Sequence, residues 1–500
     1  MADGGDRPVL RETGDGVLAC ETPLRAGGTL AVVLGHSGPG NSPGNSPGNS
    51  PGNGSGSGPW RGRFDVAEAR RLLGETLSAW RAWSGRSPYR GRHGSGHVRR
   101  SALVLRGLMS SDTGALIAAP TTSLPEWPGG GRTWDYRYLW HRDAALVVLV
   151  LMRLGHRAEA GRYLRVLLRH CTAARGDLTP MLGIDGGAGP PETVLDHLEG
   201  YRGSRPVRIG NDAEQQRQYD VHGQVLDAAL VYQQVTAGTR QALGPGELAT
   251  LFTVVDAACR VWREPDDGIW EVRNAPRHWT SSKLYLWVCL DRGIRLAESW
   301  SVPGNAPGNE PGDRPGNGPG PDTAAWRAAR QRLREDVLRR GWNAEAGTFV
   351  QSYGARNTDA SLLRLPLLGL LNGRDPRVLA TLDRIDAELG EDGWLVHRYD
   401  PAATGDGMAG PEGGFLLCAF DMVSALVLAG RRDEARQRFD ALCARAGRFG
   451  LFAEEMTADG TMLGNYPQAF THLSLVEAAM NLDAAEDEEA LHAWANRTAG

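Results

Sequence analysis

Lysine is almost missing from this chain of 500 residues. The 55 lysine and arginine residues include a single lysine, Lys283, so every other basic side chain is an arginine. We interpret the excess of arginine as a coding bias, which makes the one position that keeps an ammonium group notable. Positive charge is not in surplus either, because 59 acidic residues give a formal net charge of −4. With a pI near 6.3, the composition gives no reason to expect a nucleic acid or an acidic membrane surface as a partner.

Cysteine is also sparse, and its spacing argues against the usual cysteine-based sites. No Cys-x-x-Cys pair occurs, so neither a disulfide framework nor a zinc site is expected. The sequence has no His-Glu-x-x-His motif, phosphate loop, dinucleotide-binding glycine pattern or serine nucleophile elbow. We therefore expect no metal and no organic cofactor. The six cysteines are Cys20, Cys171, Cys259, Cys289, Cys418 and Cys443.

Long apolar runs are missing as well. The longest, Ala144 to Met152, is far shorter than the roughly 18 residues that a membrane span needs. The first residues, MADGGDRPVL, are acidic and lack the apolar core of a signal peptide. We therefore expect a cytoplasmic protein with no membrane partner.

Two segments of low complexity divide the chain. One repeats Pro-Gly-Asn-Ser and the other a looser Pro-Gly-Asn pattern, and neither has enough apolar surface to order itself, so we expect mobile surface insertions. A short β-like piece, with a plausible strand at 30–34, precedes the first of them. The predicted parts are a β-rich N-terminal piece (1–37), a linker (38–59), a connecting helical segment (60–100) and a large helical domain (101–500) with an insertion at 302–322.

Apolar residues recur with helical spacing through most of the chain. Antiparallel pairs of such helices fit a toroid of six helical hairpins, whereas an α-solenoid is the alternative, although no repeat of fixed period occurs. Long connections rich in Gly, Trp, Tyr and charged residues precede alternate helices, so in a closed toroid they would meet at one end. The helices are expected to begin near residues 143, 157, 220, 246, 280, 322, 359, 376, 413, 431, 468 and 486, and the long connections are 112–142, 174–219, 264–279, 390–412 and 447–467.

The connection before the longest apolar run is rich in Trp, Tyr and Gly and ends in an Arg-Asp doublet. Asp143 is a good N-cap residue, so a helix is expected to begin there. Flat aromatic faces beside a charged hydrogen-bonding pair suit a sugar, which has apolar ring faces and a rim of hydroxyls. A structural loop that packs its tryptophans into the core is the alternative.

Carboxylates occur in two other long connections. Glu271 follows Ile269 and Trp270, which would desolvate it and raise its pKa, as a general acid requires. Glu454 and Glu455 lie in a loop with apolar neighbours on one side and would provide a base. Glycosidic cleavage needs two carboxylates, because one protonates the leaving oxygen while the other activates water. Solvated surface glutamates are the alternative at both places.

Longer strings in these connections carry a specific resemblance. They are APTTSLPE (119–126), WDYRYLWHRDA (134–144), HLEGYRGSRPVRIGN (197–211), PDDGIWEVR (265–273), FVQSYG (349–354), EGGFLLCAF (412–420) and LGNYPQAFTHL (463–473). By these strings the chain resembles glycoside hydrolase family 15, the glucoamylase family, in its bacterial glucoamylase and trehalase branch. The resemblance implies a mainly α, (α/α)6 barrel and an inverting mechanism. Family members usually have a β-sandwich before the barrel, of which residues 1–37 would be a truncated remnant.

The resemblance also implies roles for individual residues. Glu271 matches the general acid and Glu454 the general base, with Glu455 as its neighbour. The residues that match sugar-contacting positions are Trp140, Arg142 and Asp143, which would hold the non-reducing glucose, and Arg208 and Arg398. The chain departs from the family pattern at Thr133, His141 and Asp421, where asparagine, an apolar residue and tryptophan are usual.

Together these features predict an inverting, exo-acting α-glucoside hydrolase that releases β-glucose. The strings HWTSSK and QQRQYD resemble those of trehalases, so the resemblance favours a trehalase, and a glucoamylase acting on maltooligosaccharides is the alternative. A phosphorylase on the same fold and a catalytically impaired sugar-binding relative are further alternatives. Trp270 and Lys283 are interpreted as supporting residues. Lys283 would bond carbonyls of the Glu271 loop or Glu271 itself, and a lysine retained by chance on the surface is the alternative. Arg292→Lys is expected to have little effect.

Overall fold

The computed structural model of the chain describes residues 66–300 and 321–485, together with Arg11–Glu12 and Leu18–Ala19. The chain divides into two compact units, residues 1–85 and 86–500. In the first unit, strands β1 (Arg11–Glu12) and β2 (Leu18–Ala19) pair antiparallel, and helix α1 spans Val66–Gly85. The predicted strand at 30–34, the linker at 38–59, nearly all of the insertion at 302–322 and the helix expected near 486 lie outside the described residues. The sandwich remnant therefore stays a prediction.

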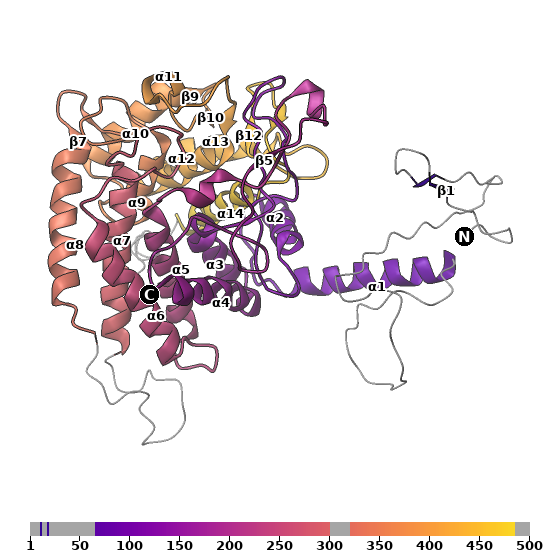
Figure 1. Cartoon of the computed structure of the whole chain (residues 1–500), viewed down its shortest axis with the longest axis horizontal. Coiled ribbons are helices and arrows are strands. Elements are labelled where there is room, and N and C mark those ends of the chain that lie inside the picture. Colours follow the sequence, from indigo (N-terminus) through magenta and orange to yellow (C-terminus); the bar gives the residue numbers. More distant parts are fainter. Residues whose placement is uncertain (1–10, 13–17, 20–65, 301–320, 486–500) are drawn as a thin grey trace, which may run out of the picture. The chain divides into compact units, whose positions relative to one another are not determined.

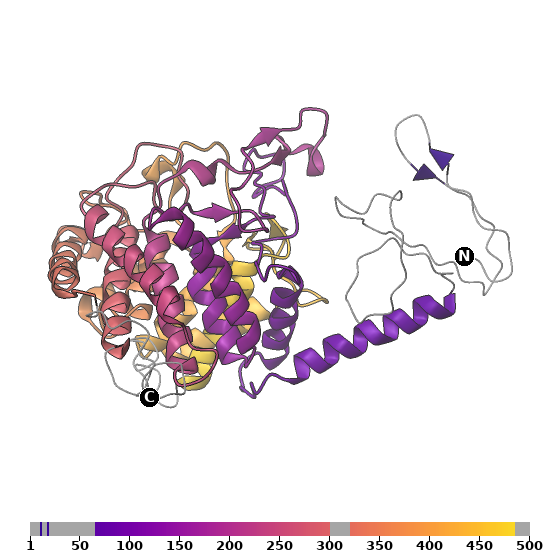
Figure 2. The same ribbon diagram turned by 60° about the horizontal axis from the view of Figure 1, so that its bottom comes forward.

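The second unit contains a closed ring of helices. Within its described residues, neighbouring inner helices contact one another in sequence order, and α14 returns to contact α3. Figure 1 shows the yellow α14 beside the purple α2 and α3, and Figure 2 shows the helices lying side by side. The inner positions are α3 (Ala144–Arg153), α5 (Asp220–Thr236), α7 (Thr280–Trp300), the short η5 (Ala360–Leu363) with α9 (Arg364–Leu367), α12 (Leu416–Leu428) and α14 (Ala469–Ala484). The outer helices are α2 (Ser95–Leu108), α4 (Arg157–Ala174), α6 (Pro245–Val261), α8 (Ala324–Asp336), α10 (Pro376–Leu389) and α13 (Arg432–Cys443).

Burial separates the inner from the outer helices. All 13 residues of α12, LLCAFDMVSALVL, are buried. A helix that is apolar on every side is stable only where protein surrounds it. Outer helix α8 buries only Trp326, Ala329 and Leu333, which form one stripe at helical spacing. The amphipathic and the wholly apolar patterns thus account for the two rings, and the predicted (α/α)6 barrel is confirmed.

The connections that enter the inner helices contain short strands. Figure 1 shows strands β5, β7, β9, β10 and β12 at the upper end of the helices, so the long connections meet at one end, as expected. The antiparallel groups are β3 (Leu139–Trp140) with β4 (Met181–Leu182), β5 (Thr193–Val194) with β6 (Arg208–Ile209), β7 (Trp342–Asn343) with β8 (Thr348–Phe349), β9 (Gly390–Glu391) with β10 (Leu395–Val396), and β11 (Gly414–Phe415), β12 (Glu455–Met456) and β13 (Met462–Leu463). Short helices are η1 (His141–Asp143), η2 (Tyr201–Gly203), η3 (Asp212–Gln215), η4 (Val337–Gly341) and α11 (Pro401–Thr404).

Two details of the predicted organisation differ from the structure. Helix α2 crosses the boundary expected between residues 100 and 101, because its apolar face packs against α14 as part of the ring. Helix α3 begins at Ala144 as expected, but Asp143 does not cap it: its backbone is helical at the end of η1, and its side chain makes no capping hydrogen bond. In the part of the chain that is described, no helix combines the length and the apolar character needed to cross a membrane.

Candidate active site

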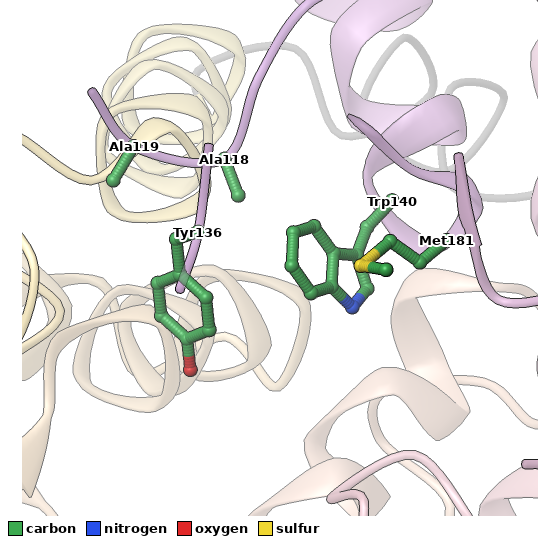
Figure 3. Packing of buried hydrophobic residues seen from close by; sticks show 5 residues of the cluster. All are labelled: Ala118, Ala119, Tyr136, Trp140 and Met181. Carbon is green, nitrogen blue, oxygen red and sulfur yellow. The ribbon is translucent and has the colours of Figure 1, made fainter. Parts of the chain in front are cut away.

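An apolar cluster at the loop end of the barrel positions two polar groups. Strand pairing places Trp140 opposite Met181. In Figure 3 the hydroxyl of Tyr136 and the indole nitrogen of Trp140 point to the same side of this cluster. Each donates to a different glutamate: Trp140 Nε1 to Glu271 Oε1 at 2.8 Å, and Tyr136 Oη to Glu454 Oε1 at 2.8 Å. The buried members of the cluster are Ala118, Ala119, Tyr136, Trp140 and Met181.

Glu271 lies at the tip of a loop whose base is closed by an antiparallel bridge between Asp266 and Arg277. Its backbone has a φ of +57°, in the left-handed region that costs a residue with a side chain about 1–2 kcal/mol. Its Oε1 also accepts a hydrogen bond from Arg142 Nη2 at 2.5 Å, and its side chain is 21% exposed. The sequence predicted a desolvated Glu271, whereas the structure places it at the edge of a cavity and beside a guanidinium.

Glu454 is the buried partner of the two, with 3% exposure. Oε1 accepts the Tyr136 hydroxyl, while Oε2 is buried and has no hydrogen-bond partner among the described residues. Gly464 leaves space beside this oxygen, because its φ is +74° and a Cβ there would lie 3.1 Å from Oε2. Burial and the negative charge of Glu126 raise the pKa of Glu454 to about 8.

Two adjoining cavities meet at Glu271. The inner cavity has a volume of about 50 Å³ and is lined by Ala118, Tyr136, Trp140, Arg142, Asp143, Trp270, Glu271, Arg398, Phe415, Glu454, Gln468 and Phe470. The outer cavity, of about 190 Å³, is lined by Trp134, Tyr136, Asn211, Asp212, Ala213, Gln216, Trp270, Glu271, Arg273, Arg398 and Met408. Glu454 thus belongs to the inner cavity alone, whereas Glu271 borders both.

Arg142 and Asp143 form a charged group in the lining of the inner cavity. Arg142 Nη2 donates to Gln218 Oε1 at 2.9 Å as well as to Glu271, and its Nε lies 3.9 Å from Asp220. Burial raises the pKa of Asp143 to about 7 and that of Asp220 to about 6, against the opposing effect of the guanidinium. Groups that lose water in this way are strong hydrogen-bonding partners for a ligand that replaces the water.

Behind Glu454 lies a buried network of carboxylates and guanidiniums. Arg398 Nη2 donates to Glu412 at 2.7 Å and to Glu126 at 3.1 Å, and Arg132 Nη1 donates to Glu412 at 2.8 Å. Oxygens of Glu126, Glu412 and Glu455 lie within 4.8 Å of one another, a spacing that would suit a metal ion. However, the guanidiniums already neutralise the first two carboxylates, so the network fits an ion-pair cluster better than a cation site.

The structure brings most of the predicted site residues together. Seven of them line the inner cavity, and Trp270, Glu271 and Arg398 also line the outer one. The seven are Trp140, Arg142, Asp143, Trp270, Glu271, Arg398 and Glu454. Three predicted residues line neither. Glu455 is fully buried behind Glu454 and accepts from the backbone nitrogen of Gly413 at 2.7 Å. Arg208 lies over the ring of Trp134, with 4.9 Å between its guanidinium carbon and the ring centroid.

Lys283 is the third predicted residue outside the cavities. It is buried in the first turn of α7, and its ammonium donates to the carbonyl of Glu264, at the start of the Glu271 loop, rather than to Glu271. Burial lowers its pKa to about 8, and the carboxylate of Asp266 opposes this effect. Lys283 therefore anchors the base of the loop and does not touch the cavity.

The sequence did not identify several residues that complete the site. Tyr136 lies inside the WDYRYLWHRDA string, and Glu126 ends the APTTSLPE string, so position within a matching string was the available signal. Arg273 follows Glu271 by two residues, and nothing in the sequence marks it as a site residue. Gln218 and Asp220 are contributed by the connection before α5 and its first residue, and only the folded chain shows that they lie beside Arg142.

The sequence profile of glycosyl hydrolases family 15 matches residues 95–480. The trehalase of Mycolicibacterium smegmatis is 42% identical over 425 residues, which are 84% of this chain and 60% of that protein. The trehalase of Mycobacterium tuberculosis is 40% identical over 425 residues, which are 84% of this chain and 59% of that protein. The chain thus spans about three fifths of the length of these curated relatives.

Solved structures with the same fold include more distant proteins. A bacterial glucoamylase complexed with acarbose has a TM-score of 0.60 at 15% identity, covering 86% of this chain and 63% of that chain. A structure described as a wild-type glycosidase has a TM-score of 0.58 at 20% identity, covering 77% and 96%. These likenesses support the fold alone. Because the family profile matches most of its length, the chain belongs to glycosyl hydrolases family 15.

Proposed function

We propose that the chain is an inverting, exo-acting α-glucoside hydrolase that releases β-glucose, and that its substrate is α,α-trehalose. The observation that supports this most is the pair Glu271 and Glu454, which reach one cavity from separate loops. Membership of family 15 and the relatives named trehalase, at 42% and 40% identity, support the same reaction class and substrate.

In the proposed reaction, Glu271 gives its proton to the glycosidic oxygen as the bond to C1 breaks. Glu454 takes a proton from a water that attacks C1 from the opposite face, which inverts the anomeric centre. The hydrogen bond from Tyr136 holds Oε1 of Glu454, and the unpartnered Oε2 is the oxygen that would accept from water. Assignment of the acid role to Glu271 rests on its match to the family pattern.

The two cavities give the two sugar rings of a disaccharide separate places. We assign the non-reducing glucose to the inner cavity, where Arg142 and Asp143 offer donors and acceptors to its hydroxyls and Trp140 a ring edge. The leaving sugar would occupy the outer cavity, and the scissile bond would lie at their junction, beside Glu271. Arg398, which lines both cavities, would contact both rings.

Trehalose and maltooligosaccharides present the same glucosyl unit to the inner cavity and differ only in the outer one. A glucan 1,4-α-glucosidase is therefore the alternative, and a catalytically impaired sugar-binding relative is the second. A phosphorylase would replace the base by a phosphate site, and a glutamate at position 454 argues against it. The cytoplasmic location expected from the sequence suits trehalose, an internal solute, and stays a prediction.

The test is glucose release from trehalose, maltose and soluble starch, each with and without phosphate. We expect glucose from trehalose, at a rate well above that from maltose, and no glucose 1-phosphate. Faster hydrolysis of starch or maltose would identify the chain as a glucoamylase. Binding of trehalose without turnover would identify an impaired relative, and glucose 1-phosphate would identify a phosphorylase.

A further inference from the structure

An ion pair lies over the tryptophan that borders the outer cavity. Glu192 accepts from Arg208 Nη1 through one oxygen and from Arg273 Nη2, at 2.9 Å, through the other. The guanidinium carbons of Arg208 and Arg273 lie 4.9 and 4.7 Å from the ring centroid of Trp134. The ring itself is fixed, because Trp134 Nε1 donates to Glu126 at 2.7 Å. We call Glu192, Arg208 and Arg273 the clamp.

The clamp joins two segments that border the site. Glu192 directly precedes strand β5 and Arg208 lies in β6, so both belong to the base of one hairpin. Arg273 lies two residues after Glu271 in the loop that carries the proposed acid. Since the side chain of Glu192 is only 7% exposed, its two charge-assisted hydrogen bonds are well shielded from water and hold the hairpin to the loop.

The position of the clamp relative to the proposed catalytic residues Glu271 and Glu454 indicates the role of the clamp in the site. Trp134 and Arg273 line the outer cavity but not the inner one, which contains Glu454. They therefore form part of the wall that is farther from the proposed base. Arg273 uses Nη2 for Glu192, and among the described residues its Nε and Nη1 have no hydrogen-bond partner, so these groups are available to the hydroxyls of a leaving sugar.

We infer that Arg273 and Trp134 form the end wall of the leaving-sugar pocket, that Glu192 positions Arg273, and that the clamp restricts the enzyme to substrates with a single leaving sugar. The inference rests on the proposed function and makes it more specific. A disaccharide fills both cavities and ends at the clamp. A longer α-glucan would have to displace a guanidinium from its buried carboxylate, which is strongly unfavourable.

The test compares three substrates in the full-length protein: trehalose, maltotriose and α-glucosyl fluoride. The fluoride has no leaving sugar, so its hydrolysis reports the inner cavity and the carboxylates alone. We expect Glu192→Gln and Arg273→Gln to lower the ratio of kcat/KM for trehalose to that for maltotriose by at least about tenfold, the usual effect of losing one charge-assisted hydrogen bond. Hydrolysis of the fluoride should change much less than that of trehalose.

Matched controls separate positioning from folding. Glu199→Gln removes an exposed carboxylate from the same hairpin and should leave the ratio unchanged. Glu192→Asp, which keeps the charge, should recover part of the ratio and lower KM for trehalose more than it raises kcat. Arg273→Gln serves as the second variant if Glu192→Gln unfolds, because the side chain of Arg273 is 35% exposed.

The outcomes are distinguishable. The inference is overturned if a folded variant that hydrolyses the fluoride keeps the wild-type ratio of kcat/KM for trehalose to that for maltotriose. It is also overturned if the wild-type protein has the same kcat/KM for the two substrates. Failure of the wild-type protein to hydrolyse the fluoride contradicts the proposed function itself, and the inference with it.

Discussion

Replacing Glu126 by glutamine should move the pH dependence of the reaction to lower pH. Glu126 is buried behind the proposed base and accepts hydrogen bonds from Trp134 and Arg398. Burial and the negative charge of Glu126 raise the pKa of Glu454 to about 8. A base must be ionised to accept a proton, so with α-glucosyl fluoride, whose leaving group needs no proton from Glu271, kcat/KM should rise with pH towards a plateau above that value. Removal of the negative neighbour lowers the pKa of Glu454 and shifts the rise to lower pH.

The size of the effect follows from the ionised fraction of Glu454. With a pKa of about 8, roughly one tenth of the free protein carries the carboxylate at pH 7. A fall of about one unit, the low end of the usual effect of a neighbouring charge, would raise this to roughly one half. At pH 7, Glu126→Gln should therefore reach a fraction of its own plateau value of kcat/KM that is about fivefold larger than the fraction wild type reaches of its plateau. The assay is the pH profile of kcat/KM, with Glu345→Gln on the surface as control. If the rise of kcat/KM with pH stays in place or moves to higher pH, Glu126 does not raise the pKa of Glu454.

Three further predictions concern single side chains. Glu271→Gln and Glu454→Gln should each lower kcat for trehalose at least about hundredfold, the usual scale of acid or base catalysis. On α-glucosyl fluoride, whose leaving group needs no proton, only Glu454→Gln should be severely impaired. The reverse result would exchange the two roles. Lys283→Arg should lower the Tm by at least about 2 °C in a thermal melt, because a guanidinium does not fit the buried contact to the Glu264 carbonyl; Arg356→Lys on the surface should leave the Tm unchanged. Asp421→Ala should lower the free energy of unfolding by about 3–5 kcal/mol in a denaturant titration, because it leaves the buried guanidinium of Arg364 without its bidentate partner. A loss below about 1 kcal/mol would contradict this.

The helical scaffold was predictable because its pattern is local. Inner helices such as α12 are apolar on nearly every side and outer helices such as α8 have one apolar stripe. Periodicity therefore predicts both that the helices exist and whether each is inner or outer. The starts of α4 and α7, at Arg157 and Thr280, agree with the expected positions. The role of α2 as an outer helix was missed, since nothing in its sequence shows that α14, at the other end of the chain, packs against it.

The matching strings predict which residues belong to the candidate site, but they do not predict how the side chains of those residues are arranged. The strings identify Glu271 and Glu454, yet the sequence neighbours suggested that Glu271 is the desolvated carboxylate. In the structure Ile269 and Trp270 are themselves buried, and Trp270 Nε1 donates to Asp359 at 3.0 Å, while Glu271 projects to the cavity. Desolvation depends on long-range packing, which the residues adjacent in sequence do not determine.

One departure from the family pattern, Asp421, has a structural reason that a single sequence does not show. Asp421 forms two hydrogen bonds, of 2.6 and 2.5 Å, with Arg364, which also donates to Glu477 at 2.9 Å.

The sequence predicts that Arg292 tolerates lysine, but this residue is buried and donates to Asp227, at 2.8 Å, and to two further acceptors. A lysine there would lose part of this planar set of contacts, so Arg292 is unsuitable as a silent control.

Proton NMR of the first products of trehalose hydrolysis, recorded before the anomers of glucose equilibrate, tests the inverting mechanism. Inversion by Glu271 and Glu454 converts the attacked ring into β-glucose, while the leaving ring keeps its α configuration. We therefore expect equal amounts of α- and β-glucose in the earliest spectra, whereas α-glucose alone, from both rings, would rule out inversion. Glu455→Gln should give the same pattern at a nearly normal rate; loss of activity in this variant together with a mild effect of Glu454→Gln would show that the base is the neighbouring residue.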